Sequence, residues 1–204
     1  MPDRKPRKDA ARNRAAAFAA ADDLFARCES PDAVTMADIA AAAGVGKATL
    51  FRAFGDRTGL IRALYGARLE PVRSAADEGP PPLGPAAPPL LRVPALLDAL
   101  LCFKLDNRHL ALALEGTGGG GAGPYRAEHY EWWHGLLRGA LEEIPGLAGD
   151  SDFTAHALLA AVRADLVEHL VGQERTGRER MRSQLAAFTA RVLGSAAGSG
   201  ATKG

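Results

Sequence analysis

The sequence contains few aromatic residues, two cysteines and no long apolar run. Aromatic residues make up 6% of the 204 residues, while 47% are hydrophobic, with alanine and leucine prominent. Such a composition favours helices over sheets. Because Cys28 and Cys102 lie far apart within apolar helical patterns, we expect buried, reduced thiols and no disulfide. No run of 18 apolar residues occurs, so the sequence predicts no membrane span and a cytoplasmic protein.

A large excess of one charge is also absent, because the formal net charge is +1. This excludes a molecule that binds polyanions over its whole surface. Cations are nevertheless concentrated in residues 1–14, and residues 1–9 are polar, basic and interrupted by two prolines. They predict a disordered arm, which either reaches DNA phosphates or the minor groove or serves as a solubilising tail. No continuous apolar segment follows, so we do not expect a secretory signal.

The most informative stretch is VTMADIAAAAGVGKATLFRAF, residues 34–54, which predicts two short helices joined by a tight turn. Apolar residues recur at helical spacing over residues 36–43. Thr35 precedes them as an N-cap, and Asp38 follows in an acidic first turn. Gly44 ends the helix, because glycine adopts the left-handed conformation at low cost.

The second helix of this stretch covers residues 47–54, and its spacing points Leu50 and Phe54 inward. Small and cationic residues remain on or near the outward face, and they are Lys47, Ala48, Thr49 and Arg52. Such residues near the N-terminal end of an exposed helix suit insertion into a major groove. The alternative is an ordinary helical hairpin within an all-α core.

TMADIAAAAGVGKATLFRAFGDRTGLI resembles the helix-turn-helix of TetR-family transcriptional regulators, and the preceding RNRAAAFAAADDLFARCES resembles that family's first helix. The resemblance covers about the first third of the chain. It implies a double-stranded operator DNA as partner. The DNA-binding residues that it implies are Thr35, Lys47, Ala48, Thr49, Phe51, Arg52 and Arg57.

The chain departs from the family pattern at the DNA contacts. The family usually has tyrosine at the position of Phe51 and often histidine at that of Ala53, and both usually reach phosphates. Gly46 replaces the usual serine at the start of the second helix and is a poorer N-cap. Arg52, Arg57 and the basic arm are expected to compensate, with Arg57 in the place of a phosphate-binding lysine.

The domain organisation follows from proline and glycine content and from helical periodicity. We predict an all-α protein with a helix-turn-helix DNA-binding domain at residues 10–70, after the arm at residues 1–9. A Pro-rich connection at residues 71–94 leads to a helical ligand-binding and dimerisation domain at residues 95–194, and a disordered tail covers residues 195–204.

The second domain is expected to hold a pocket for an unidentified small molecule. Its predicted lining combines large apolar surfaces with single polar groups. The candidates are Phe103, Asn107, Leu110, Tyr125, His129, Trp132, Trp133, Asp165 and His169. For each of them, core filling or surface exposure is the alternative. Asp165 and His169 lie one helical turn apart, where they form either a polar ligand anchor or an exposed pair.

The last two predicted helices, up to about residue 174 and from about residue 178, each carry an apolar stripe. With no later element to cover them, they are expected to pair with a second copy as a four-helix interface. Packing within the same chain is the alternative. The predicted homodimer residues are Leu159, Leu166, Leu170, Met181, Leu185, Phe188 and Val192.

Enzymatic, metal and cofactor sites are not predicted. His129 and His134 are five residues apart and face different directions on a helix, and neither an HExxH motif nor a cysteine cluster occurs. No nucleophile elbow is present. The resemblance implies a homodimeric repressor that a small molecule releases from a near-palindromic operator. Two alternatives remain: a ligand-independent or activating DNA-binding regulator, and a small-molecule-binding protein with a weakened DNA-binding domain.

Overall fold

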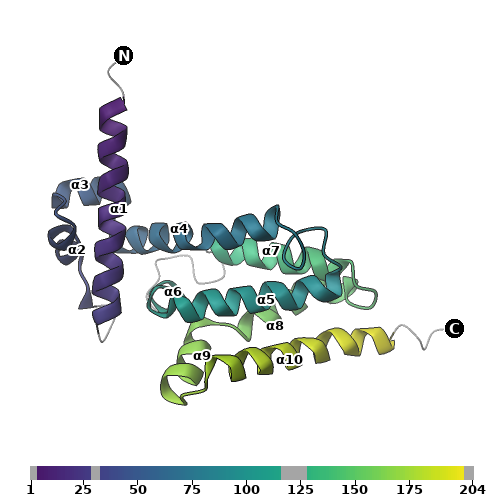
Figure 1. The fold of residues 1–204 in the computed structure, drawn as a ribbon. Helices are drawn as coiled ribbons and strands as arrows, with labels where there is room; N and C mark the ends of the chain where they lie inside the picture. The colour runs from purple at the N-terminus through teal and green to yellow at the C-terminus, as the bar shows by residue number, and fades with distance from the viewer. Residues whose placement is uncertain (1–3, 29–32, 116–127, 200–204) are drawn as a thin grey trace. The chain divides into compact units, whose positions relative to one another are not determined.

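The computed structural model describes residues 4–28, 33–115 and 128–199, and the regular structure within these ranges is helical throughout (Figure 1). This confirms the predicted all-α class. The described residues form two compact units, which we call the head and the body. The head contains the described residues up to 68 together with residues 109–115, and the body contains residues 69–108 and 128–199.

The helices of the head pack through apolar side chains that range in size from alanine to phenylalanine and tyrosine. Its N-terminal part consists of α1 (Arg4–Arg27), α2 (Met36–Ala43), α3 (Lys47–Phe54) and the first half of α4 (Arg57–Asp77). The bounds of α2 and α3 agree with the prediction. Buried positions recur every three or four residues along these helices, and they include Ala17, Ala21, Phe25, Ile39, Leu50, Leu60, Ile61 and Leu64.

Both ends of the chain are helical further than the sequence led us to expect. The predicted disordered arm covers residues 1–9, but α1 already begins at Arg4. Pro6 is tolerated because it lies in the first turn, where a backbone N–H has no helical acceptor. At the other end, the last helix, α10 (Arg178–Ser199), continues past the predicted boundary at residue 194.

A helix that we assigned to the second domain belongs to the head. The block at residues 95–115 forms two helices, and residues 109–115 of α6 (Arg108–Glu115) group with the head. The rings of His109 and Phe25 stack there with centroids 5.8 Å apart. Burial lowers the pKa of His109, although the nearby Asp22 carboxylate opposes this shift. These contacts join positions far apart in sequence, so helical periodicity alone did not reveal them.

The Pro-rich connection is shorter than predicted, because helices enter it from both sides. Residues 71–94 were predicted to be the connection, but α4 runs through Pro71 to Asp77, and α5 (Pro89–Asp106) begins at a proline. Proline suits the first helical position, where its missing N–H costs nothing. Pro94 removes one backbone hydrogen bond inside α5, and the packing of the buried leucines that follow offsets this loss.

In the body, the buried positions of α5 recur every three or four residues and form one broad, mainly apolar face. Val93, Leu96, Leu97, Leu100 and Leu101 are all at most 1% exposed. In the body, α10 packs along α5, and α7 (Glu128–Glu142) packs against α8 (Ser151–Ala160) (Figure 1). A short helix, α9 (Ala164–Glu168), and one π-helical turn (His169–Gln173) precede α10.

The long helix that we predicted from residue 151 to about residue 174 is interrupted after α8. Arg163 has an extended backbone conformation with ψ 144°, and it separates α8 from α9. The buried Lys104 Nζ donates a 2.8 Å hydrogen bond to the carbonyl oxygen of Val162. A lysine of α5 thus satisfies a carbonyl at the interruption, where no helical amide is available.

No helix of the described chain combines the length and the apolar character needed to cross a membrane.

Candidate nucleic-acid interface

The turn between α2 and α3 has the geometry that its sequence predicted. Thr35 Oγ1 accepts a 3.3 Å hydrogen bond from the Asp38 amide, and Asp38 Oδ2 accepts a 3.0 Å bond from the Thr35 amide. These reciprocal bonds form a capping box. Gly44 ends α2 with φ 62°, and the Val45 amide bonds to the Ala40 carbonyl at 3.0 Å. Local hydrogen bonds therefore fix the direction in which α3 leaves the turn.

The second helix, α3, is anchored by one fully buried side chain and is otherwise largely exposed. Leu50 is 1% exposed, and Phe54 is half-buried against α1, with its ring centroid 5.7 Å from that of Phe18. Gly46 is the N-cap residue and provides no side-chain hydrogen bond. The first amides of α3 therefore lack a protein cap, unlike those of α2.

The predicted DNA-binding residues of α3 lie mainly on its accessible side. Lys47, Ala48 and Arg52 are exposed, and Thr49 is half-buried. The ring of Phe51 is 39% exposed, and the Lys47 Nζ lies 5.9 Å from its centroid. This cation–π contact keeps the lysine at the surface of the helix. Phe51 itself has no hydroxyl to donate to a phosphate.

Two further predicted DNA-binding residues make contacts within the head, and those of Arg57 were not indicated by the sequence. The Thr35 hydroxyl donates to Asp38 Oδ2 at 2.6 Å, so its only hydrogen is already used. The Arg57 Nε donates to the Val34 carbonyl at 2.8 Å, and its guanidinium lies 5.6 Å from the Phe25 ring centroid. Arg57 therefore links the start of α4 to α1 and to the segment before α2. Phosphate contacts by these residues remain predictions.

A groove of about 220 Å³ lies between α1 and α3. Asn13 and Arg14 of α1 line it together with Thr49 and Arg52 of α3. The Arg14 guanidinium lies 5.5 Å from the ring centroid of Phe54. Cations from α1 and α3 consequently lie next to each other, although they are 38 positions apart in the sequence. The positive charge predicted for the N-terminal segment thus adjoins the candidate recognition helix.

The structure places the predicted ligand-pocket residues in different surroundings. Phe103, Asn107 and Trp133 are buried, and the Asn107 amide donates to the Phe103 carbonyl at 2.8 Å. Trp132 is half-buried, with the Arg73 guanidinium 4.9 Å from its ring centroid. The remaining candidates also differ in location: His129 is half-buried, Leu110 belongs to the head, Asp165 and His169 are exposed, and Tyr125 lies outside the described residues.

Asp165 and His169, predicted as either a ligand anchor or an exposed pair, are both exposed and contact other residues. Asp165 forms an ion pair with Arg163 at 2.9 Å, and the arginine's hydrogen bonds lower the pKa of Asp165. His169 contacts Gln173 at 2.8 Å and Glu174 at 3.1 Å. Each side chain is therefore engaged by a neighbour at the surface.

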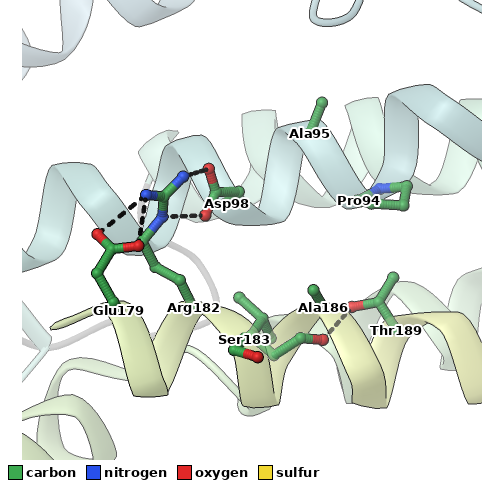
Figure 2. A pocket seen from close by; sticks show the side chains of 9 residues that line it. Pro94, Ala95, Asp98, Glu179, Arg182, Ser183, Ala186 and Thr189 are labelled. Carbon is green, nitrogen blue, oxygen red and sulfur yellow. Dashed lines mark hydrogen bonds and ion pairs between the residues drawn. The ribbon is translucent and has the colours of Figure 1, made fainter. Parts of the chain in front are cut away.

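A groove of about 430 Å³ between α5 and α10 was not predicted (Figure 2). Arg182 of α10 donates from Nε and Nη2 to the Asp98 carboxylate of α5, at 2.7 and 2.8 Å. These bonds lower the pKa of Asp98. Figure 2 shows Glu179 contacting the same guanidinium, while Thr189 bonds back to its own helix. The charged groups of the groove thus pair with one another.

The predicted dimerisation residues are divided between the interior and the surface. Leu159, Met181 and Leu185 are at most 8% exposed within their own chain. Leu159 belongs to α8, which packs against α7, and the other two belong to α10, which packs along α5. For these three, the alternative of packing within the same chain describes the structure. Leu166 is 37% exposed, and Leu170, Phe188 and Val192 are half-buried. Sequence reasoning missed Phe153 on α8, which is 75% exposed.

Comparison with known proteins supports the resemblance of the head to the DNA-binding domain of TetR-family regulators. Residues 18–64 match the family model for bacterial regulatory proteins of the tetR family. A solved structure from Rhodococcus sp., assigned to the TetR-family transcriptional regulators, is similar over 89% of this chain and 98% of its own. The two share 21% sequence identity, with a TM-score of 0.63. No curated protein sequence matches the chain.

Proposed function

We propose, starting from the premise that residues 18–64 are a TetR-family DNA-binding domain, that this chain is a homodimeric repressor. It binds a near-palindromic operator through α3 and is released by a small molecule that binds the body. The observation that carries this proposal is the exposed face of α3. Lys47, Ala48 and Arg52 are exposed on this helix, while Leu50 is buried and anchors it in the head.

Sequence readout is assigned to the N-terminal half of α3. The Lys47 ammonium is suited to the acceptor atoms of guanine in the major groove, and the methyl groups of Ala48 and Thr49 are suited to the methyl group of thymine. Each good base contact discriminates by about 1–3 kcal/mol. Because α3 is only eight residues long, few bases are read by one head. A second copy is therefore needed for a specific site.

Phosphate contacts are assigned to cations beside α3. Arg52 is exposed on the helix itself, and Arg14 of α1 lines the adjacent groove. Such contacts position a protein on the duplex without reading sequence, and they make affinity fall steeply with salt. They compensate for Phe51 and Ala53, which lack the polar groups that a phosphate requires.

Dimerisation is assigned to the apolar surface that the body leaves exposed. Phe153 of α8 is 75% exposed and Leu166 of α9 is 37% exposed. The half-buried Leu170, Phe188 and Val192 extend this apolar character onto the π-helical turn and α10. An isologous contact through these residues supplies the two-fold symmetry that a palindromic operator requires. The two heads then read half-sites about 34 Å apart or somewhat further.

Release follows from a population shift between conformers of the dimer. A ligand that binds the body more tightly when the heads are too far apart for adjacent major grooves lowers the affinity for DNA. By linkage, DNA lowers the affinity for that ligand by the same factor. The predicted residue Trp132, which is half-buried, supplies part of the large apolar surface that such a ligand requires.

The experiment compares a double variant of α3 with a control of matched charge. Lys47→Ala combined with Thr49→Ala should weaken binding to a footprinted fragment from the chain's own upstream region by about a hundredfold, because two base contacts are lost. Arg191→Ala removes one exposed cation from α10 and should bind as the wild type does. Fluorescence anisotropy at several salt concentrations measures affinity, and sedimentation equilibrium measures the dimer. Equal affinity of the double variant and the control would refute the assigned contacts.

A further inference from the structure

We propose that His134, Asp152 and His156 form a binding site for one divalent transition-metal ion, which links α7 to α8. In the sequence, His134 is near only one other histidine, His129, at an unsuitable spacing, and no metal site was predicted. In the structure, His134 of α7 instead lies next to His156 of α8. The two imidazole rings stack with centroids 4.0 Å apart, and one Asp152 carboxylate faces both.

The geometry of the three side chains is close to that of a metal site. His134 Nε2 lies 3.5 Å from Asp152 Oδ1, and His156 Nε2 lies 4.0 Å from Asp152 Oδ2. One ligand atom from each residue falls within 4.8 Å of the other two. Around a tetrahedral zinc ion, with bonds of about 2.0–2.2 Å, ligand atoms are about 3.4 Å apart. To bind an ion, the stacked rings would have to turn until both Nε2 lone pairs point at it, and the ion would replace the 3.2 Å contact between His134 Nε2 and the Asp152 carbonyl oxygen.

The donor set selects the class of metal. Two imidazole nitrogens and one carboxylate oxygen suit Zn²⁺, Co²⁺ and Ni²⁺, whereas Mg²⁺ and Ca²⁺ prefer oxygen ligands alone. The Asp152 and His156 side chains are 68% and 43% exposed, so an ion can reach the site directly from solvent. Three protein ligands leave at least one position for water.

Neighbouring side chains already orient this donor set. The Tyr130 hydroxyl lies 2.6 Å from His156 Nδ1. When Nδ1–H donates to the tyrosine oxygen, Nε2 keeps the lone pair that a metal requires, and Nε2 is the atom facing Asp152. Arg138 lies 3.9 Å from Asp152 and 3.4 Å from Glu142. Glu142 can therefore keep this guanidinium when the metal takes the Asp152 carboxylate.

The chain provides its own comparison in His169. This histidine lies 3.1 Å from Glu174 and is also exposed, but its other ring nitrogen contacts Gln173 at 2.8 Å. Among the described residues, no third metal-binding side chain completes a group around it. His169 with Glu174 and His156 with Asp152 are thus both histidine–carboxylate pairs. Of the two, only the pair of His156 and Asp152 lies next to a second histidine, His134.

The experiment titrates Co²⁺ into the full, untagged chain after removal of metals with a chelator. We expect one equivalent per chain, a visible ligand-field absorption band, and displacement of Co²⁺ by Zn²⁺. Asp152→Asn and His156→Gln should each weaken binding at least tenfold, and Tyr130→Phe should weaken it less by removing an orienting contact. His169→Gln should bind as the wild type does. Zn²⁺ should raise the melting temperature of the wild type but not that of Asp152→Asn or His156→Gln.

Several outcomes would overturn the site. Wild-type affinity in both Asp152→Asn and His156→Gln would place the metal elsewhere, as would loss of binding in His169→Gln. Absence of a Co²⁺ band in the wild type would also refute it. Circular dichroism verifies that the variants are folded, and the exposed Asp152 is the safest position in this respect. None of these measurements uses DNA, so their result is independent of the proposed repressor function.

Discussion

Two neighbouring helices of the head have the same length and different surroundings. Both α2 and α3 contain eight residues, but α2 buries Met36, Ile39 and Ala40, whereas α3 buries Leu50 alone. A capping box begins α2 and a left-handed glycine ends it, while α3 begins without a side-chain cap. The hydrogen bonds and apolar contacts that hold the hairpin thus belong mainly to α2. The side chains of α3 remain available for a partner.

The largest stability effect is expected in the buried helix. Ile39→Ala should lower the free energy of unfolding by about 3 kcal/mol, because Ile39 is fully buried and the truncation leaves a cavity. Lys47→Ala, an equally simple truncation in α3, should change it by less than about 0.5 kcal/mol. Chemical denaturation followed by circular dichroism measures both. Similar losses of unfolding free energy in the two variants would contradict the view that α2 stabilises the head while the exposed residues of α3 do not.

A smaller effect is expected at the cap of α2. Thr35→Ala should destabilise the head by about 1 kcal/mol, because the Asp38 amide loses its acceptor. Thr35→Ser keeps the hydroxyl and should stay close to the wild type. The matched pair can be compared by thermal unfolding at neutral pH. A loss of the same size in the serine variant would point to the threonine methyl group instead of the cap.

The same cap predicts a dependence on pH. The Thr35 hydroxyl and amide lower the pKa of Asp38. The folded state therefore favours the charged carboxylate, and its stabilisation is complete above the ordinary aspartate pKa of about 3.9. It is lost as the pH falls through the lowered value. The difference between wild type and Thr35→Ala should accordingly shrink below about pH 4, and a constant difference down to pH 2 would contradict this account.

The smallest effect is expected where α3 lacks a cap. Gly46→Ser should stabilise the head by a few tenths of a kcal/mol, because the serine oxygen can accept a bond from a first-turn amide. A Cβ at this position meets only Thr49 Oγ1, at 3.7 Å, so there is room for it. Gly46→Ala adds the same Cβ without the hydroxyl and should not stabilise. An alanine variant as stable as the serine variant would attribute the gain to reduced freedom of the unfolded chain.

The head was predictable because short-range signals specify it. The bounds of α2 and α3, the cap at Thr35 and the turn at Gly44 all depend on residues within a few positions of one another. The inward role of Arg57 was not predictable, because its acceptor belongs to Val34, which lies 23 positions earlier. A cation at a helix start has the same sequence signature whether it faces a phosphate or a carbonyl.

In the body, helical periodicity predicted which segments are helical but not how they meet. The interruption after α8 involves Lys104, 58 positions from its acceptor Val162. The covered side of α10 depends on its packing against α5, which buries Met181 and Leu185. An apolar stripe is equally compatible with a partner in the same chain and with one in another chain.

By itself, the sequence determined the all-α class, the helix-turn-helix and its caps, and the exposure of Lys47 and Arg52. These features follow from backbone preferences and from hydrogen bonds between near neighbours, which are the same in any context. Only the tertiary structure decided that Arg57 faces Val34, that α5 covers α10, and that His134 meets His156. Such pairings depend on which helices pack together, and periodicity within a single helix carries no information about its neighbour.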